Sequence, residues 1–365
     1  MKKLISKLQG LKKTTKVDFA TYLGVIAAFI IVSVCKNQGM LSRSVSGMLV
    51  PICCYIVMAI SLNLTVGILG ELSLGHAGFM SVGAFSGVIA AMSLEPSIPS
   101  PVIRLIIAIV VGAVFAALAG IVVGIPVLRL RGDYLAIVTL AFGEIIKEIM
   151  NCLLVGYDSR GLHMTLNLSG QKTIDSLGMD ETGVAIIKGA QGATGTTKIA
   201  TFTAGFILIM VALIIILNMV RSRSGRAILA VRDNRIAAES VGINVTKYKM
   251  LAFVTSAALA GAAGALYSLN YSNMAASKFD FNTSILVLVY VVLGGLGRIW
   301  GSIIAAAVLY ILPEALREFS DYRMLVYAIV LILVMLITNN PQAKALIARI
   351  TAKFRKSEEE EGTKA

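Results

Sequence analysis

Apolar residues in this chain are gathered into blocks of membrane-spanning length, separated by short polar segments. A helix needs about 20 mostly apolar residues to cross a bilayer. The apolar side chains recur all round each helical turn, which excludes the one-sided pattern of a surface helix. The pattern predicts an all-α, polytopic membrane bundle with about ten transmembrane or re-entrant segments. The clearest blocks are 17–34, 102–128, 199–220, 250–270 and 324–338.

Composition supports a membrane protein. Of the 365 residues, 57% are hydrophobic and 15% are charged, with a mean hydropathy of +0.84, whereas soluble chains carry about 25% charged residues. The net charge of +13 would fit a nucleic-acid ligand, but the charges lie between and beyond the spans, so we expect none. The four cysteines show no metal-ligand spacing and are interpreted as reduced, buried thiols.

The distribution of Lys and Arg predicts the orientation of the chain. Cytoplasmic segments of membrane proteins carry the excess of these residues. A ten-segment arrangement with both termini inside places 22 basic residues in cytoplasmic segments and 10 outside. No small-x-small cleavage site follows the first apolar run, so it is interpreted as an uncleaved helix. The predicted location is the cell membrane, multi-pass.

This arrangement divides the chain into a cytoplasmic basic tail, 1–16, a transmembrane domain, 17–338, and a cytoplasmic C-terminal tail, 339–365. Residues 156–198 form a neutral extracytoplasmic loop. Residues 221–249 form a cytoplasmic loop with net charge +5. Segment boundaries within 45–93 and 281–318 are left open.

The cytoplasmic loop 221–249 predicts one short helix. Ser224 can cap its N-terminus and Gly242 can end it. Between them, the helix 226–241 mixes apolar residues with arginines. Such a helix can rest on anionic lipid headgroups or dock a cytoplasmic partner. The residues themselves leave both interpretations open.

Several stretches resemble a known family. Residues 237–243 are similar to a variant of the EAA loop of ABC importer permeases. The chain as a whole resembles the branched-chain amino acid permease family of LivM type, over about residues 45–338. The stretches that carry the resemblance are GELSLGHAGF at 70–79, RLRGDYLAIVTLAFGE at 129–144, the segment 225–267, and GGLGRIWG at 294–301.

The resemblance implies the membrane-spanning subunit of an ABC importer for leucine, isoleucine and valine. It implies four other subunits: a second, LivH-like permease, two cytoplasmic ATPases and an extracytoplasmic solute-binding protein. The loop 221–249 would then be the coupling segment that meets the ATPase. Its expected coupling residues are Gly225, Arg226, Arg232, Arg235, Ala238, Glu239 and Gly242. A permease of the same family for urea, sugars or nucleosides remains an alternative.

Two apolar regions are interrupted by glycines. The first contains Gly67, Gly70, Gly75, Gly78 and Gly83, and the second contains Gly294, Gly295, Gly297 and Gly301. Broken membrane helices persist only where protein or water satisfies the freed backbone, and they mark transport pathways. Close packing through small residues is the other explanation. For the first region we favour a pathway, because Glu71, Ser73, Gly75 and His76 lie in it; the second is left open.

Glu144 lies in a predicted span. An ionisable group at that depth pairs or faces an aqueous cavity, so Glu144 is either an intrahelical partner of Lys147 or a pathway residue. If Glu71, His76 or Glu144 served as a proton relay, the chain could be a self-sufficient secondary transporter.

Nucleotide chemistry is not expected in this chain. The sequence contains no G-x-x-x-x-G-K-[ST] phosphate-binding motif and no catalytic Ser/His/Asp grouping. We therefore expect no enzyme activity and no cofactor, with ATP bound by partner subunits.

Overall fold

The computed structural model describes residues 13–40, 42–130, 132–158, 160–167, 177–180 and 183–317, and isolated positions between 322 and 332. The chain divides into two compact units, Met1–Ala307 and Val308–Ala365. The description below concerns the first unit. The expected C-terminal tail, 339–365, and most of the apolar block 324–338 lie outside the described residues, as do residues 1–12 of the expected N-terminal tail.

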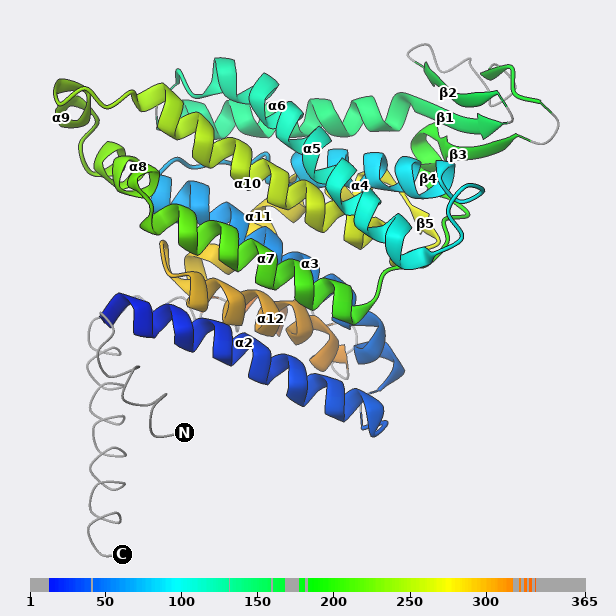
Figure 1. The fold of residues 1–365 in the computed structure, drawn as a ribbon, viewed down its shortest axis with the longest axis horizontal. Coiled ribbons are helices and arrows are strands. Elements are labelled where there is room, and N and C mark those ends of the chain that lie inside the picture. The colour runs from blue at the N-terminus through cyan, green and yellow to red at the C-terminus, as the bar shows by residue number, and fades with distance from the viewer. Residues whose placement is uncertain are drawn as a thin grey trace, which may run out of the picture. The chain divides into compact units, whose positions relative to one another are not determined.

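A bundle of long apolar helices forms the first unit (Figure 1). Its most enclosed member is α3 (Arg43–Asn63), which continues into the π-helical turn η1 (Leu64–Leu69) and is buried along almost its whole length. Against it packs α10 (Val245–Ser268), which also contacts α4 (His76–Ser93) and α5 (Pro101–Val127) closely. These four helices make the core.

Glycines bring three core helices into backbone contact. A Cβ at Gly83 of α4 would overlap the backbone of Gly261 of α10, and one at Gly264 would overlap Met80. A Cβ at Gly112 of α5 would come too close to the carbonyl oxygen of Gly83 at the same contact. Because lipid tails are as apolar as leucine, membrane helices associate through such close packing rather than through the hydrophobic effect. Gly83 is therefore a packing residue and not part of a helix break.

The predicted membrane bundle is confirmed in its broad form. In the described part of the chain, six helices are long and apolar enough to cross a bilayer. Besides α3 with η1, α4, α5 and α10, these are α2 (Lys13–Asn37) and α7 (Phe202–Arg221). Two shorter apolar helices are α11 (Phe281–Gly294) and α12 (Ile299–Ala315). The charged helix α6 (Asp133–Cys152) completes the set. The count of about ten segments remains a prediction.

An antiparallel sheet departs from the all-α prediction. It has the strand order β2-β1-β3-β4-β5. Most of it forms from the loop 156–198, where Gly and Thr obscured the short alternating strands. The strands are β1 (Leu153–Asp158), β2 (Gly161–Leu166), β3 (Val184–Lys188), β4 (Ala193–Thr194) and β5 (Asn273–Met274).

Asp158 stabilises the turn between β1 and β2. Its carboxylate accepts hydrogen bonds from the backbone N–H groups of Arg160, Gly161 and Asp180, and contacts His163. Desolvation alone would raise the pKa of Asp158, but these hydrogen bonds outweigh it and hold the pKa below its usual value. The carboxylate is thus ionised at neutral pH.

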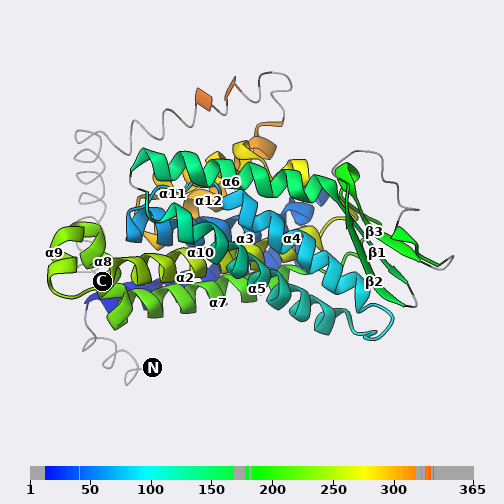
Figure 2. The same ribbon diagram turned by 90° about the horizontal axis from the view of Figure 1, so that it is seen from above.

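The sheet and the segment 221–249 lie at opposite ends of the helix bundle in both views (Figures 1 and 2). The segment forms α8 (Arg223–Asp233) and α9 (Arg235–Ser240). The location of loops 156–198 and 221–249 on opposite sides of a membrane stays a prediction.

We expect Gly83→Ala to lower the thermal unfolding midpoint of the purified protein, since the added methyl group meets the Gly261 backbone and overpacking costs about 1–3 kcal/mol. The matched control is Gly47→Ala in α3, where a Cβ meets nothing within 4 Å. The control should be neutral or slightly stabilising, because alanine favours a helix over glycine. Equal midpoints for the two variants would contradict the packing described.

Candidate functional site

The first glycine-rich region is a true helix break. The chain leaves η1 at Gly70, whose φ of +81° favours glycine, and then runs without regular structure until α4 begins at His76. The π-helical turn frees backbone groups, one of which is recovered when Thr65 O accepts the N–H of Glu71. The interruption predicted for the region Gly67–Gly83 is therefore present between η1 and α4, whereas Gly78, like Gly83, lies inside α4 and packs against Gly143.

The second region combines both explanations that the sequence left open. Gly295 and Gly297 have φ values of +93° and +77°, and they separate α11 from α12. Gly294 and Gly301 lie on the flanking helices, where a Cβ on either would overlap the backbone of the other. The positive φ values of Gly295 and Gly297 thus separate α11 from α12, and the close packing of Gly294 on Gly301 brings the adjoining ends of these helices together.

Asn63 joins the two breaks. Its Oδ1 accepts the backbone N–H of Gly297 at 2.8 Å, and its Nδ2 donates to Ser302 Oγ at 2.8 Å. A Cβ at Gly67 would overlap both Asn63 Oδ1 and Gly297 N, so only glycine leaves room for this bridge. Asn63 is fully buried, where an unmade hydrogen bond is costly.

Arg232 of α8, in the segment 221–249, contacts the first break beside the Asn63 bridge. Its Nη1 donates to Gly67 O at 3.4 Å, and its Cγ would lie 2.7 Å from a Cβ at Gly70. The guanidinium also pairs with Asp233 at 2.9 Å. We call Asn63, Gly67, Gly70, Arg232 and Gly297 the break junction. It connects α8 to both interrupted helices.

Glu71 has a partner that the sequence analysis missed. Its carboxylate forms an ion pair with Lys249 of α10, and both side chains are largely buried. Lys249 was counted as a loop charge, because it stands four residues after the start of α10 and just before the apolar run. The pair holds the irregular segment 70–75, which follows η1, against the core helix α10.

His76 lies in a separate polar contact. Its Nε2 is 2.8 Å from Ser61 Oγ, and Ser61 Oγ donates its one proton to Met58 O at 2.9 Å. With the Ser61 proton directed to Met58 O, His76 would donate from Nε2 to Ser61 Oγ. Ser73 is buried and its hydroxyl has no hydrogen-bond partner among the described residues, and a Cβ at Gly75 would overlap Thr139 O.

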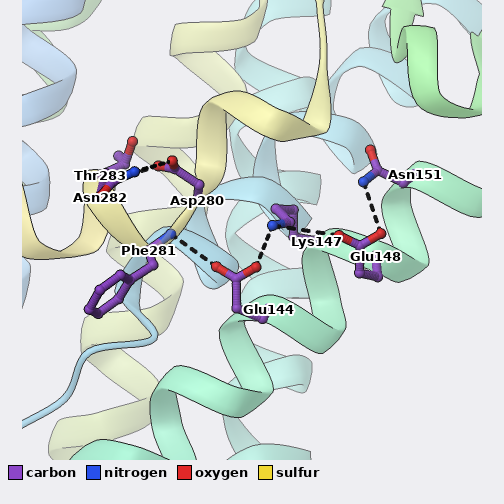
Figure 3. A network of polar contacts seen from close by, with 8 residues as sticks. All are labelled: Glu144, Lys147, Glu148, Asn151, Asp280, Phe281, Asn282 and Thr283. Carbon is purple, nitrogen blue, oxygen red and sulfur yellow. Dashed lines mark hydrogen bonds and ion pairs between the residues drawn. The ribbon is translucent and has the colours of Figure 1, made fainter.

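Glu144 links α6 to the start of α11 (Figure 3). The expected ion pair with Lys147 is present. The other carboxylate oxygen accepts the backbone N–H of Phe281 at 3.0 Å, a contact that the sequence did not reveal. Among the described residues, no hydrogen bond or ion pair connects Glu144, Glu71 and His76 to one another.

The segment 221–249 differs from the single helix expected. Asn234 interrupts it with an extended backbone and caps α9 by accepting the N–H of Ala237 at 3.1 Å. The cap of α8 is Ser222, which accepts the N–H of Gly225, and not Ser224. Short polar side chains compete with the helix backbone for hydrogen bonds. Asn234 therefore favours the end of α8 and the start of a second helix, α9. Gly242, with φ +82°, ends α9 as predicted.

The expected coupling residues fall into two groups. Ala238 packs with Val231 and Val245, and Gly225 fits tightly against the end of α7, so both shape the segment. Arg226 is exposed, and Arg235 and Glu239 form an i,i+4 pair at 3.1 Å. A feature missed from the sequence is the apolar surface of α9: Ile236 and Val241 are 79% and 73% exposed.

A comparison with protein families matches residues 44–335 to the permease component of the branched-chain amino acid transport system. The chain belongs to this permease family. The expected resemblance is therefore confirmed, and the chain is a multi-pass membrane protein of a transport family rather than of an enzyme class.

Two relatives and one solved structure place the chain further. It is 32% identical over 293 residues to the high-affinity branched-chain amino acid transport system permease protein LivM of Escherichia coli K12. That match covers 77% of this chain and 66% of the relative, slightly less than two thirds of its length. The ribose import permease protein RbsC of Escherichia coli K12 is 32% identical over 129 residues, covering 33% of this chain and 40% of the relative.

The solved structure is a metal-chelate type ABC transporter in an inward-facing conformation. It is 14% identical and covers 92% of this chain and 99% of its own, with a TM-score of 0.41. This similarity is too low to support a conclusion. In the described part of this permease, no group of three or more His, Cys, Asp or Glu side chains is placed to hold a metal ion.

We expect Asn63→Ala to destabilise this permease by about 1–3 kcal/mol, because it removes both hydrogen bonds of a fully buried side chain, the one accepted from the Gly297 N–H and the one donated to Ser302 Oγ. Thermal unfolding measures the loss, and hydrogen–deuterium exchange of the peptide around Gly297 should accelerate. Ser302→Ala is the control for exchange: it leaves Asn63 Nδ2 without its acceptor and so also lowers stability, but it keeps the Gly297 N–H paired. Unchanged exchange at Gly297 in Asn63→Ala, or equal acceleration there in both variants, would show that Asn63 does not hold the second break.

Proposed function

We propose that this chain is the membrane-spanning subunit of an ABC importer that moves leucine, isoleucine and valine into the cell. Family membership and the similarity to LivM support the substrate class. The sequence lacks a nucleotide-binding motif of its own. The proposed complex therefore contains two cytoplasmic ATPases, a second permease subunit and an extracytoplasmic solute-binding protein.

The observation that carries the proposal is the exposed surface of α9. Ile236 and Val241 project from a short helix that has only its inner side packed, against the cluster around Ala238. The exposed ion pair Arg235–Glu239 lies on the same short helix. Large exposed apolar side chains rimmed by polar groups are typical of a protein interface. We assign this surface to the ATPase.

The break junction supplies the connection between docking and transport. Movement of an ATPase against α9 would be passed to α8, which packs on η1 and touches Gly67 through Arg232. Both interrupted helices meet there through Asn63. A break is a place where two rigid helices can change their angle without loss of helical hydrogen bonds. Coupling would thus act on both breaks at once.

A proton-driven secondary transporter is less well supported. The residues that would form its relay lie in separate contacts: Glu71 with Lys249, His76 with Ser61, and Glu144 with Lys147. A sugar permease retains one observation in its favour, the partial similarity to RbsC. Uptake assays with the complete transporter, comparing labelled leucine with labelled ribose, distinguish these substrates.

We expect Ile236→Asp to abolish co-purification of the ATPase subunits with the permease. The change places a charge in the centre of the proposed interface, where it would lose its water. Membrane insertion and the thermal unfolding midpoint should stay unchanged, because the Ile236 side chain is 79% exposed.

Lys278→Asp is the control, since it introduces the same residue at an exposed position on the η4 turn (Ala276–Phe279), next to β5. It should leave the ATPases bound. If Ile236→Asp retained a full complement of ATPase, the docking assignment would fail.

A further inference from the structure

Helix α11 is too short to cross a membrane. Its 14 residues span about 21 Å at 1.5 Å per residue, against a hydrocarbon core of about 30 Å. Its C-terminal end meets the break junction, where Gly297 contacts Asn63 and Gly67. The N-terminal end, at Phe281, therefore lies less than one hydrocarbon thickness away from the break junction.

Two carboxylates bind the N–H groups at this helix start, and they come from different elements (Figure 3). Asp280 caps its own helix by accepting the N–H of Thr283 at 2.9 Å. Glu144 belongs to α6 and accepts the N–H of Phe281 at 3.0 Å. Negative charge at a helix N-terminus is stabilised by the helix dipole. The Glu144 contact thus ties two separate helices together.

The contact closes a narrow crevice between α4, α6 and α11. Gly78 and Gly143 face each other across it, with a Cβ on Gly78 only 2.9 Å from Gly143 Cα. The buried hydroxyl of Ser284 and the side chain of Leu140 also line it. Because α11 supplies Phe281 and Ser284 to the lining, the crevice would widen if α11 moved away from α6.

The outer face of α6 is polar at the same level. Glu148, one turn beyond Glu144, is 64% exposed, and Asn151 on the next turn bonds to it at 3.2 Å. Charges at membrane depth face water or another protein and not lipid. The Glu144 contact therefore lies beside a hydrated or protein-covered surface, where water can compete for it.

We propose that Glu144 is a gating latch: its bond to the N–H of Phe281 holds the start of α11 against α6 and keeps the crevice closed, and transport requires its release. The latch is a positioning residue that acts through α11. Only its link to transport rests on the proposed function.

The closed state can be tested without transport, by labelling a cysteine inside the crevice. The reporter is Ser284→Cys, in a background in which Cys35, Cys53, Cys54 and Cys152 are replaced. In the reconstituted complete transporter, a small water-soluble methanethiosulfonate should react slowly with this cysteine. Adding Glu144→Ala should speed the reaction by about tenfold or more, since a hydrogen bond to a charged group is lost.

Two further variants separate a latch from a general loss of charge or of structure. Glu148→Ala is the matched control: among the described residues, this carboxylate one turn away pairs with Lys147 and Asn151 of its own helix, and labelling should not change. Glu144→Gln keeps the shape and an acceptor oxygen and should react at an intermediate rate. Equal labelling with Glu144→Ala and without it, or equal acceleration by Glu148→Ala, would overturn the proposal.

The role in transport is tested by locking the latch. A short, reducible thiol crosslinker joins the double variant Glu144→Cys/Phe281→Cys in the complete transporter. Uptake should stop on crosslinking and return on reduction, whereas a crosslink within α6, from Glu148→Cys/Asn151→Cys, should leave it unchanged. Normal uptake by the locked protein would mean that Glu144 only braces the fold. If the unmodified transporter shows no ATP-driven uptake, the proposed function fails, while the labelling result still decides the latch.

Discussion

The side chain of Asn63 binds two helices that are both interrupted in the membrane, and the arrangement around it depends on those two hydrogen bonds. One bond satisfies the backbone of Gly297 in the second break, and the other reaches Ser302 on α12. The bridge needs a residue without a side chain at Gly67. That same residue offers its carbonyl to Arg232. The Asn63 bridge, the two breaks and the segment 221–249 therefore meet where the backbones of Gly67 and Gly297 lie close together.

Glycines serve two different purposes in this permease, and the difference matters for movement. In the core, Gly83 and Gly261 let α4 and α10 touch through their backbones, which makes a rigid body. At Gly70, Gly295 and Gly297 positive φ values turn the chain instead. The turning points lie at the ends of helices: Gly70 separates η1 from α4, and Gly295 and Gly297 separate α11 from α12. Force applied at α8 would therefore bend the bundle at the breaks and not within the core.

Hydropathy and glycine spacing were enough to predict the membrane bundle, an interruption within the region Gly67–Gly83 and the helix end at Gly242. They could not predict partners that lie far apart in sequence. The Glu71–Lys249 pair and the contact of Glu144 with Phe281 join residues more than a hundred positions apart, and no periodic pattern records them. The sheet was missed because its strands are short. The split at Asn234 was missed because arginines and alanines on both sides favour one helix.

The central claim is that Arg232 carries movement from the ATPase surface to the break junction. The most direct test is the ratio of amino acid uptake to ATP hydrolysis by the reconstituted transporter carrying Arg232→Ala. The account predicts that the ATPases remain bound and hydrolyse ATP, while the amount of leucine taken up per ATP falls steeply. An unchanged ratio in a variant that retains its ATPases would contradict it.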